Sequence, residues 1–325
     1  MRFNTIILLS LAILLISVAN VLILPPFEGF DEIAHYSSIK QIAETGTIPI
    51  SGKSYLSQYV IDYRQHGPVP YSTLQPPFTL SDRMTYPEFF AKPDLFAAYI
   101  HKYRELPTGQ AFSPSAEPNW EAMHPPLYYL MMAPLMKMMD SLPFVSQFLV
   151  LRLVSLVVAL AGFVIALNGS LKHFKTEPMR KCVLSGFLFY PLIVPMFFLE
   201  FARLGNDSLC IFIIGIFWSV LLRWLENERN LKLPFYIGIC LGLGLLTKGF
   251  FMPISFGFGL FLLFRLWQGR HDRELSIYRL YGVGLIVVPV ILLAGYWYIS
   301  RMLGSTSGGA MNIWRYYMVE NGLRD

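Results

Sequence analysis

Long apolar runs separated by short polar stretches are the dominant pattern of this chain. A helix needs roughly 20 mostly apolar residues to cross a bilayer. Five runs approach that length, at residues 6–24, 147–167, 182–199, 208–224 and 281–300. A sixth run, at 234–264, is too long for one untilted span and is interrupted at Thr247-Lys248-Gly249. We therefore expect a hairpin of two short spans there, and an all-α polytopic membrane protein overall.

The run at 6–24 follows Arg2, as the apolar part of a signal peptide follows basic residues. It is long for such a region, however, and no small-residue cleavage site precedes Pro25. We expect an uncleaved membrane anchor. A weaker run at 125–139 contains Pro134 and Lys137, and its length favours an interfacial or re-entrant helix over a span.

Basic residues in the connecting loops predict the orientation, because cytoplasmic loops are enriched in Lys and Arg. The basic loops fall on one side only if 125–139 does not cross the membrane and 234–264 crosses twice. This predicts seven spans, with the N-terminus inside and the C-terminus outside. The external loop at 25–146 then carries 12 acidic and 8 basic residues. The basic residues that this topology places on the cytoplasmic side are Arg2; Lys172, Lys175, Arg180 and Lys181; Arg223, Arg229 and Lys232; and Arg265, Arg270, Arg273 and Arg279.

Composition agrees with a membrane location. Hydrophobic types make up 54% of the 325 residues and charged types 14%, against about 25% charged residues in soluble domains. This excludes a soluble enzyme, a disordered chain and a simple nucleic-acid binder. The cysteines Cys182, Cys210 and Cys240 lie in apolar runs and behave as small hydrophobes. We predict one transmembrane module at 1–303 and an external tail at 304–325.

Candidate chemistry follows the first span. Asp31 and Glu32 lie a few residues beyond the membrane edge, and Asp31 and His35 would share one face of a helix that begins there. Acidic residues at a span end are costly unless water, a metal or a partner satisfies them. The simpler alternative is a capped amphipathic helix that lies on the membrane.

A second external turn brings further charges to the same membrane face. It contains Arg203 and Asp207, and Lys248 lies at the tip of the predicted hairpin. Carboxylates beside cations suit acid–base or metal-assisted transfer on a phosphate-bearing lipid. Lys248 either meets an anion or extends its ammonium group to the interface.

Four segments together resemble GT-C membrane glycosyltransferases, such as protein O-mannosyltransferases and lipid A aminoarabinose transferases. They are PPFEGFDEIAHY with the downstream IAETGTIPI, HPPLYYLMMAPL from His124, FARLGND from Phe201, and GLGLLTKG from Gly242; WYISR at 297–301 is a weaker match. These matches extend from residue 5 to about residue 301. Each motif is loose alone, but their order and spacing are specific together.

The resemblance implies transfer of a sugar from a polyprenyl-phosphate or polyprenyl-diphosphate carrier to an acceptor on the external face. Asp31 would be the catalytic base, with Glu32 as an adjacent contributor. Arg203 and Lys248 would bind the lipid phosphate, with Arg301 as a weaker third. In some relatives a divalent metal, Mg or Mn, is held by the first two external loops. Here its ligands would be Asp31 and Asp207, with His35 or His124.

The sugar and the acceptor, whether protein, lipid or glycan, stay open, as does the oligomeric state. Membrane lipids are expected partners and nucleic acid is not; the sequence is typical of a prokaryotic plasma-membrane protein. Relatives usually continue beyond the seventh span, so the chain would be a minimal or truncated version. A non-catalytic homologue that binds polyprenyl lipid or scaffolds an envelope complex is one alternative. A transporter or flippase is another, although acidic residues in the middle of the spans are absent.

Overall fold

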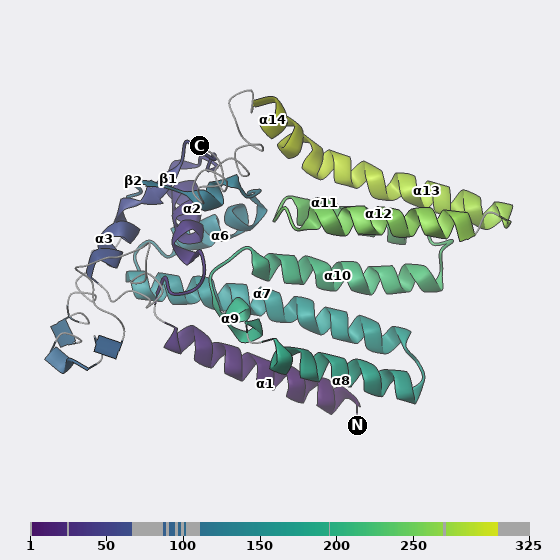
Figure 1. The fold of residues 1–325 in the computed structure, drawn as a ribbon, viewed down its shortest axis with the longest axis horizontal. Helices are drawn as coiled ribbons and strands as arrows, with labels where there is room; N and C mark the ends of the chain where they lie inside the picture. The colour runs from purple at the N-terminus through teal and green to yellow at the C-terminus, as the bar shows by residue number, and fades with distance from the viewer. Residues whose placement is uncertain are drawn as a thin grey trace, which may run out of the picture.

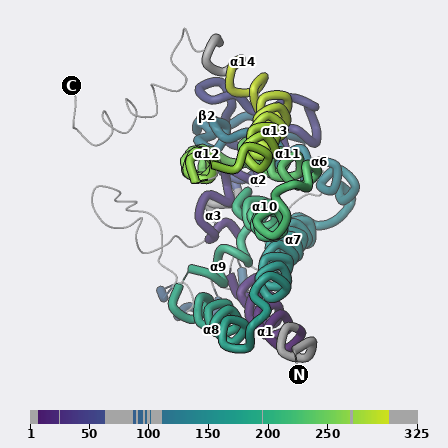
Figure 2. The backbone as a smooth tube through the Cα atoms, turned by 90° about the vertical axis from the view of Figure 1, so that its right-hand side faces the viewer, coloured from purple at the N-terminus to yellow at the C-terminus, as the bar shows by residue number. Residues whose placement is uncertain are grey.

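Long helices that lie side by side form most of the molecule (Figure 1). A computed structural model describes residues 2–24, 26–66, 111–194, 196–268 and 271–304, with short pieces at 87–88, 91–94, 97–98 and 101. Figure 2 shows the same bundle turned by 90°, with α1 and α8 at one side and α13 at the other. The long helices are α1 (Arg2–Ile23), α7 (Phe144–His173), α8 (Glu177–Ile193), α10 (Asp207–Glu226), α11 (Lys232–Leu245), α12 (Phe251–Gln268) and α13 (Arg273–Val290).

Four helical stretches in the described part of the chain are long and apolar enough to cross a membrane. They are Phe144–His173, Asp207–Glu226, Phe251–Gln268 and Arg273–Ser300. The last combines α13 with a π-helical turn, η3 (Ile291–Gly295), and the start of α14 (Tyr296–Gly304). Ile7–Ile23 and Lys232–Leu245 are shorter apolar helices. Each predicted span thus contains helix, while the total of seven membrane crossings stays a prediction.

One predicted span differs in its bounds. Residues 182–199 do not form a continuous helix, because α8 ends at Ile193 and the short helix α9 (Phe197–Ala202) follows. Val194 precedes a proline and has an extended backbone, with φ −104 and ψ 98. A residue before proline is disfavoured in the α region, which explains the interruption.

The hairpin predicted at 234–264 is present as α11 and α12, and the break falls at Thr247-Lys248-Gly249 as expected. Gly244 allows the close return of the chain, since a Cβ there would overlap the ring of Phe251. Helices α7 and α10 also approach closely at glycines, because Gly162 lies against the backbone of α10 and Gly215 lies against the backbone of α7. Small residues at such contacts let helix backbones approach closely within a membrane.

A small layer of structure covers the bundle end opposite the N-terminus (Figure 1). It contains α2 (Glu32–Thr45), α3 (Gln58–His66), and α6 (Leu127–Met138), which packs against α2. With 12 residues, α6 is too short to span a bilayer, in agreement with a non-crossing segment. The all-α prediction is wrong here, because β1 (Tyr55–Ser57) pairs antiparallel with β2 (Pro114–Pro118). The two strands lie far apart in sequence, so no local hairpin signal marks them.

Candidate functional site

The chain turns sharply between α1 and α2, and Asp31 lies in this turn. Asp31 has a left-handed backbone, with φ 61 and ψ 6, which is uncommon for a residue other than glycine. Its carbonyl accepts the amides of Ala34 and His35 at 3.0 Å each, so α2 begins at Glu32 as predicted. Its side chain does not cap the helix. Instead, Asp31 Oδ1 accepts a hydrogen bond of 2.8 Å from the indole of Trp120.

Glu32 points into the protein and is fully buried beside Arg152 of α7. Arg152 Nε donates to Glu32 Oε1 at 2.7 Å and Nη2 donates to Oε2 at 2.6 Å, a bidentate ion pair. The amides of Gly29 and Leu204 donate to the same carboxylate at 2.9 and 2.7 Å. Because four donors occupy its oxygens, Glu32 has the contacts of an anchor that joins the α1–α2 turn to the α9–α10 turn. The arrangement therefore does not support a direct chemical role for Glu32.

Arg203 joins the turn between α9 and α10 to the turn between α1 and α2. Its Nη1 donates to the carbonyl of Phe30 at 2.7 Å, and its Nε donates to Glu200 at 2.7 Å. Its Nη2 pairs with Asp207, the first residue of α10. Lys248 approaches the same carboxylate from the other side, with Nζ at 2.8 and 2.9 Å from the two oxygens. Asp207 therefore lies between both of the cations predicted to bind phosphate.

The hairpin tip is fixed against neighbouring elements by backbone contacts. The amide of Leu127, at the start of α6, donates to the carbonyl of Leu246 at 3.0 Å. Asn206 is fully buried and its Nδ2 contacts the carbonyl of Thr247 at 3.5 Å. From α14, the hydroxyl of Tyr298 donates to the carbonyl of Leu245 at 3.0 Å. These contacts hold the hairpin tip in place, and Lys248 is linked to the segment that carries Asp31 through Asp207 and Arg203.

A buried polar cluster lies beside these charges and centres on Glu121 of the 3-10 turn η2 (Trp120–Met123). Glu121 Oε2 is 3.2 Å from His124 Nε2 and 3.5 Å from His35 Nδ1. The hydroxyl of Tyr129 donates to the same oxygen at 3.4 Å and lies 2.9 Å from His35 Nδ1. The cluster thus joins α2, η2 and α6, three elements separated by up to 94 residues.

Burial controls the charges in this cluster. Burial, with a further contribution from the negative charge of Asp31, raises the pKa of Glu121 to about 7. Burial and, to a smaller extent, the positive charge of Lys248 together lower the pKa of His124 to about 4. Burial also lowers the pKa of His35 well below its usual value. Glu121 and His124 are therefore both neutral near pH 6, and Glu121 is the group of this cluster that titrates near neutrality.

The residues predicted as metal ligands do not form a metal site as they are arranged. In the part of the chain that the structure describes, no three His, Cys, Asp or Glu side chains have the spacing to hold an ion. The carboxylate of Asp207 is occupied by Lys248 and Arg203, while His35 Nδ1 contacts Tyr129. Asp31 contacts Trp120, and His124 contacts Glu121.

Two further predictions fall on less fully described parts of the chain. Arg301 belongs to α14, but its side chain lies outside the described residues. The predicted external tail at 304–325 lies outside them beyond Gly304.

The sequence interpretation did not identify Glu121, Tyr129 or Arg152, and it named Trp120 only among the aromatic residues of a loop that could contact sugar. Arg152 carried a usable signal, because an arginine within an apolar run needs a buried partner. Glu121 and Trp120 lie in a polar loop with no periodic pattern. Only the packing of that loop on α2 brings them to Asp31, so their sequence neighbours give no sign of it.

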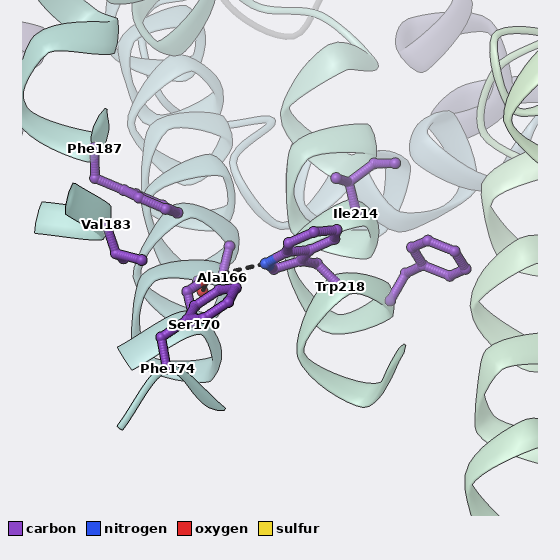
Figure 3. Close-up of a pocket in the computed structure, with 8 residues that line it drawn as sticks. Ala166, Ser170, Phe174, Val183, Phe187, Ile214 and Trp218 are labelled. Atoms are coloured by element: carbon purple, nitrogen blue, oxygen red, sulfur yellow. Dashed lines mark hydrogen bonds between the residues drawn. The ribbon is translucent and has the colours of Figure 1, made fainter. Parts of the chain in front are cut away.

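A cavity of about 490 Å³ lies away from the charged cluster, between α7, α8 and α10 (Figure 3). Its one hydrogen bond in Figure 3 joins Trp218 Nε1 to Ser170 Oγ at 2.8 Å. Its lining residues are mostly apolar: Ala166, Ser170, Phe174, Val183, Phe187, Ile214, Phe217 and Trp218. The cavity therefore suits an apolar chain rather than a charged group. Among these residues, Ile214 follows Asp207 by about two helical turns on α10.

Comparison with known families gives one match. A family model described as "Predicted membrane protein (DUF2142)" matches residues 14–324. The chain belongs to the DUF2142 family. The DUF2142 match includes every candidate site residue, and it agrees with the several apolar helices of an integral membrane protein. Searches of curated proteins and of solved structures found no match.

Proposed function

We propose that this protein is a GT-C-like glycosyltransferase that uses a sugar donor linked to a polyprenyl phosphate or diphosphate. The observation that carries the proposal is the convergence of Asp31, Arg203, Asp207 and Lys248 at one end of the helical bundle. The bond from Arg203 to the carbonyl of Phe30 brings this charge cluster next to Asp31. A carboxylate beside a paired arginine and lysine matches the needs of transfer from a phosphate carrier.

The chemistry is an inverting displacement. Asp31 takes the proton of the acceptor hydroxyl, and the hydroxyl oxygen forms a bond to the anomeric carbon of the donor sugar. The bond from that carbon to the phosphate oxygen breaks, and its electron pair leaves with the polyprenyl phosphate or diphosphate. Lys248 and Arg203 stabilise the negative charge that grows on this leaving group.

The lipid tail requires an apolar surface that begins near the phosphate. The cavity between α7, α8 and α10 supports this, since Ile214 lies about two turns along α10 from Asp207. A polyprenyl chain whose phosphate contacts Lys248 would reach this cavity along the helices. The arrangement separates an uncharged binding region from the charged reaction site.

The proposed topology has seven spans, a cytoplasmic N-terminus and an external site. The turn from α7 to α8, the turn from α10 to α11 and the turn from α12 to α13 lie at the same end of the bundle as the N-terminus (Figure 1). These turns carry the basic residues of the short loops. The site lies at the opposite end, which supports an external reaction. A prokaryotic plasma membrane is the compartment we propose.

One observation favours a non-catalytic lipid-binding homologue as the second candidate. Asp207 already pairs with both Arg203 and Lys248, so an incoming phosphate must compete with a carboxylate of the protein itself. Such a site could hold a carrier lipid without turnover. Binding of lipid with no transfer of sugar would favour this alternative.

The direct test is a transfer assay with purified protein in liposomes and short-chain polyprenyl-phosphoryl hexoses. Wild type should release polyprenyl phosphate when acceptors are present. Asp31→Asn should lower the rate by about 10²-fold or more, because the base is lost, while insertion and thermal stability are retained. Asp140→Asn is the matched control, an exposed aspartate of the same external loop. Equal rates for Asp31→Asn and Asp140→Asn would remove Asp31 from the mechanism.

A further inference from the structure

The turn η2 presents its first two side chains in opposite directions. Glu121 enters the buried cluster, whereas Trp120 stays at the surface with 42% of its area exposed. The preceding residue, Asn119, is buried and fixes the turn on α2. Its Nδ2 donates to the carbonyl of Ala34 at 3.2 Å and to Ser38 Oγ at 3.0 Å, and its Oδ1 accepts the amide of Glu121 at 3.0 Å. Trp120 is therefore an exposed aromatic residue on an anchored backbone.

The indole of Trp120 is oriented by its bond to Asp31 Oδ1. Phe30, beside Asp31 in sequence, is 70% exposed, and Met123 of the same turn is 39% exposed. Exposed apolar side chains thus lie on both segments that meet at the Asp31–Trp120 bond. Exposing a large aromatic surface to water has a free-energy cost, which binding a ligand with an apolar face would remove.

The bond geometry restricts what can approach Asp31. The indole N–H occupies Oδ1, so an acceptor hydroxyl meets the other oxygen, Oδ2. Any group that carries this hydroxyl then lies within a few ångströms of the indole ring. A pyranose has a face of C–H bonds that fits the electron-rich face of an aromatic ring, while its hydroxyls point outward. The side chain of serine or threonine offers little such surface.

We propose that Trp120 is the stacking platform for the acceptor, and that this acceptor is a carbohydrate whose reacting hydroxyl faces Asp31. This inference rests on the proposed glycosyltransferase function, which it deepens by naming the acceptor class. Trp120 would act in two ways, through its ring on the acceptor sugar and through its N–H on the orientation of Asp31.

Two substitutions separate these contributions. Trp120→Phe keeps an aromatic ring and removes the N–H, so the KM for a glycan acceptor should change little while kcat falls about tenfold or more. Trp120→Ala removes both, so the acceptor KM should also rise about tenfold. The KM for the polyprenyl-phosphoryl hexose donor should stay within about twofold in both variants. Trp267→Phe is the matched control, an exposed tryptophan at the opposite end of the bundle.

A binding measurement keeps the inference testable without turnover. Methyl pyranosides and short oligosaccharides are titrated into wild type while tryptophan emission is recorded. At least one should shift the emission of wild type and of Trp267→Phe but not that of Trp120→Ala. A sugar-dependent shift of equal affinity that persists in Trp120→Ala overturns the inference, and so does the absence of any shift across the panel. Such a shift in a protein that transfers no sugar would refute the proposed function and leave the binding platform standing.

In the transfer assay, a glycan acceptor that reacts equally well in wild type and Trp120→Ala overturns the inference. So does a peptide acceptor used in preference to every glycan. Both results would leave a working glycosyltransferase, so the failure of this inference is distinct from the failure of the proposed function.

Discussion

Glu32 and Arg152 lie 120 residues apart in sequence and form a bidentate ion pair, with N–O distances of 2.7 and 2.6 Å. Arg152 also donates to the carbonyl of Leu24 at the end of α1 at 2.6 Å. The pair thus fixes the end of the first helix, the turn that carries Asp31 and the loop at Leu204 relative to α7. It sets the separation between the proposed base and the cations.

Breaking this pair should be costly. Arg152→Met leaves the Glu32 carboxylate buried without its main partner, which we expect to reduce the free energy of unfolding by about 3–5 kcal/mol. Unfolding of the purified protein in mild detergent measures this. The control is Arg229→Met, because its pair with Glu274 is largely exposed and should be worth less than about 1 kcal/mol. Equal losses in the two variants would contradict the anchoring role.

The buried cluster should give opposite pH slopes. The pKa of Glu121 is raised to about 7, so its contribution to stability is present below about pH 4.5 and is lost as the pH rises towards about 7. The pKa of His124 is lowered to about 4, so its contribution is present above about pH 6.5 and is lost as the pH falls towards about 4. His35, whose pKa burial also lowers well below its usual value, adds a second slope of the same sign as that of His124. In wild type the free energy of unfolding should therefore rise with pH between about 4.5 and 6.5.

Single substitutions should expose each slope. Compared with wild type, the free energy of unfolding should rise more steeply with pH in Glu121→Gln and less steeply in His124→Gln, each by a difference of up to about 3 kcal/mol across about pH 4 to 7. Thermal unfolding at a series of pH values measures both. Glu117→Gln, at an exposed position of β2, should follow wild type. Slopes that match wild type in both cluster variants would contradict the assigned protonation states.

Lys248 should contribute directly to binding of the carrier phosphate. Lys248→Gln should weaken the affinity for a short-chain polyprenyl-phosphoryl hexose by about tenfold to 100-fold, the range for loss of a charge-assisted hydrogen bond. Binding to detergent-solubilised protein measures this, together with its salt dependence. Lys53→Gln removes an exposed lysine from the segment between α1 and α7 and serves as the control. Affinity unchanged in Lys248→Gln would exclude the hairpin tip as the phosphate site.

The seven-span topology predicts which loops a membrane-impermeant thiol reagent reaches in intact cells. In a background without Cys182, Cys210 and Cys240, Lys53→Cys and Phe250→Cys should react directly. Arg229→Cys should react only after the membrane is permeabilised. Phe250 is the decisive position, since it lies at the hairpin tip and is 65% exposed. Labelling of Phe250→Cys only after permeabilisation would mean that α11 and α12 do not cross as a pair.

Much of the helical layout could be predicted because apolar runs set helix positions in a membrane protein. The hairpin break at Lys248 and the short helix α6 agree with the sequence pattern. The β1–β2 pair escaped prediction because its strands are short and joined by contacts distant in sequence. The sequence pattern also predicted that Asp31, Arg203 and Lys248 lie at one membrane face. It did not predict which residues each of them contacts.

The partners change the interpretation of individual residues. Glu32 stands next to Asp31 in sequence, yet one carboxylate binds Arg152 in the interior and the other contacts an exposed indole. Sequence adjacency alone could not distinguish an anchor from a reactive group. Glu121 was missed for the converse reason, since its cluster forms only when α2, η2 and α6 pack together.

The most direct test of the central claim is an experimental structure with a non-hydrolysable polyprenyl-phosphoryl hexose analogue bound. The account predicts the phosphate within hydrogen-bond distance of Lys248 or Arg203, the lipid tail between α7, α8 and α10, and the sugar facing Asp31. A phosphate bound at the opposite end of the bundle, or a sugar turned away from Asp31, would contradict it.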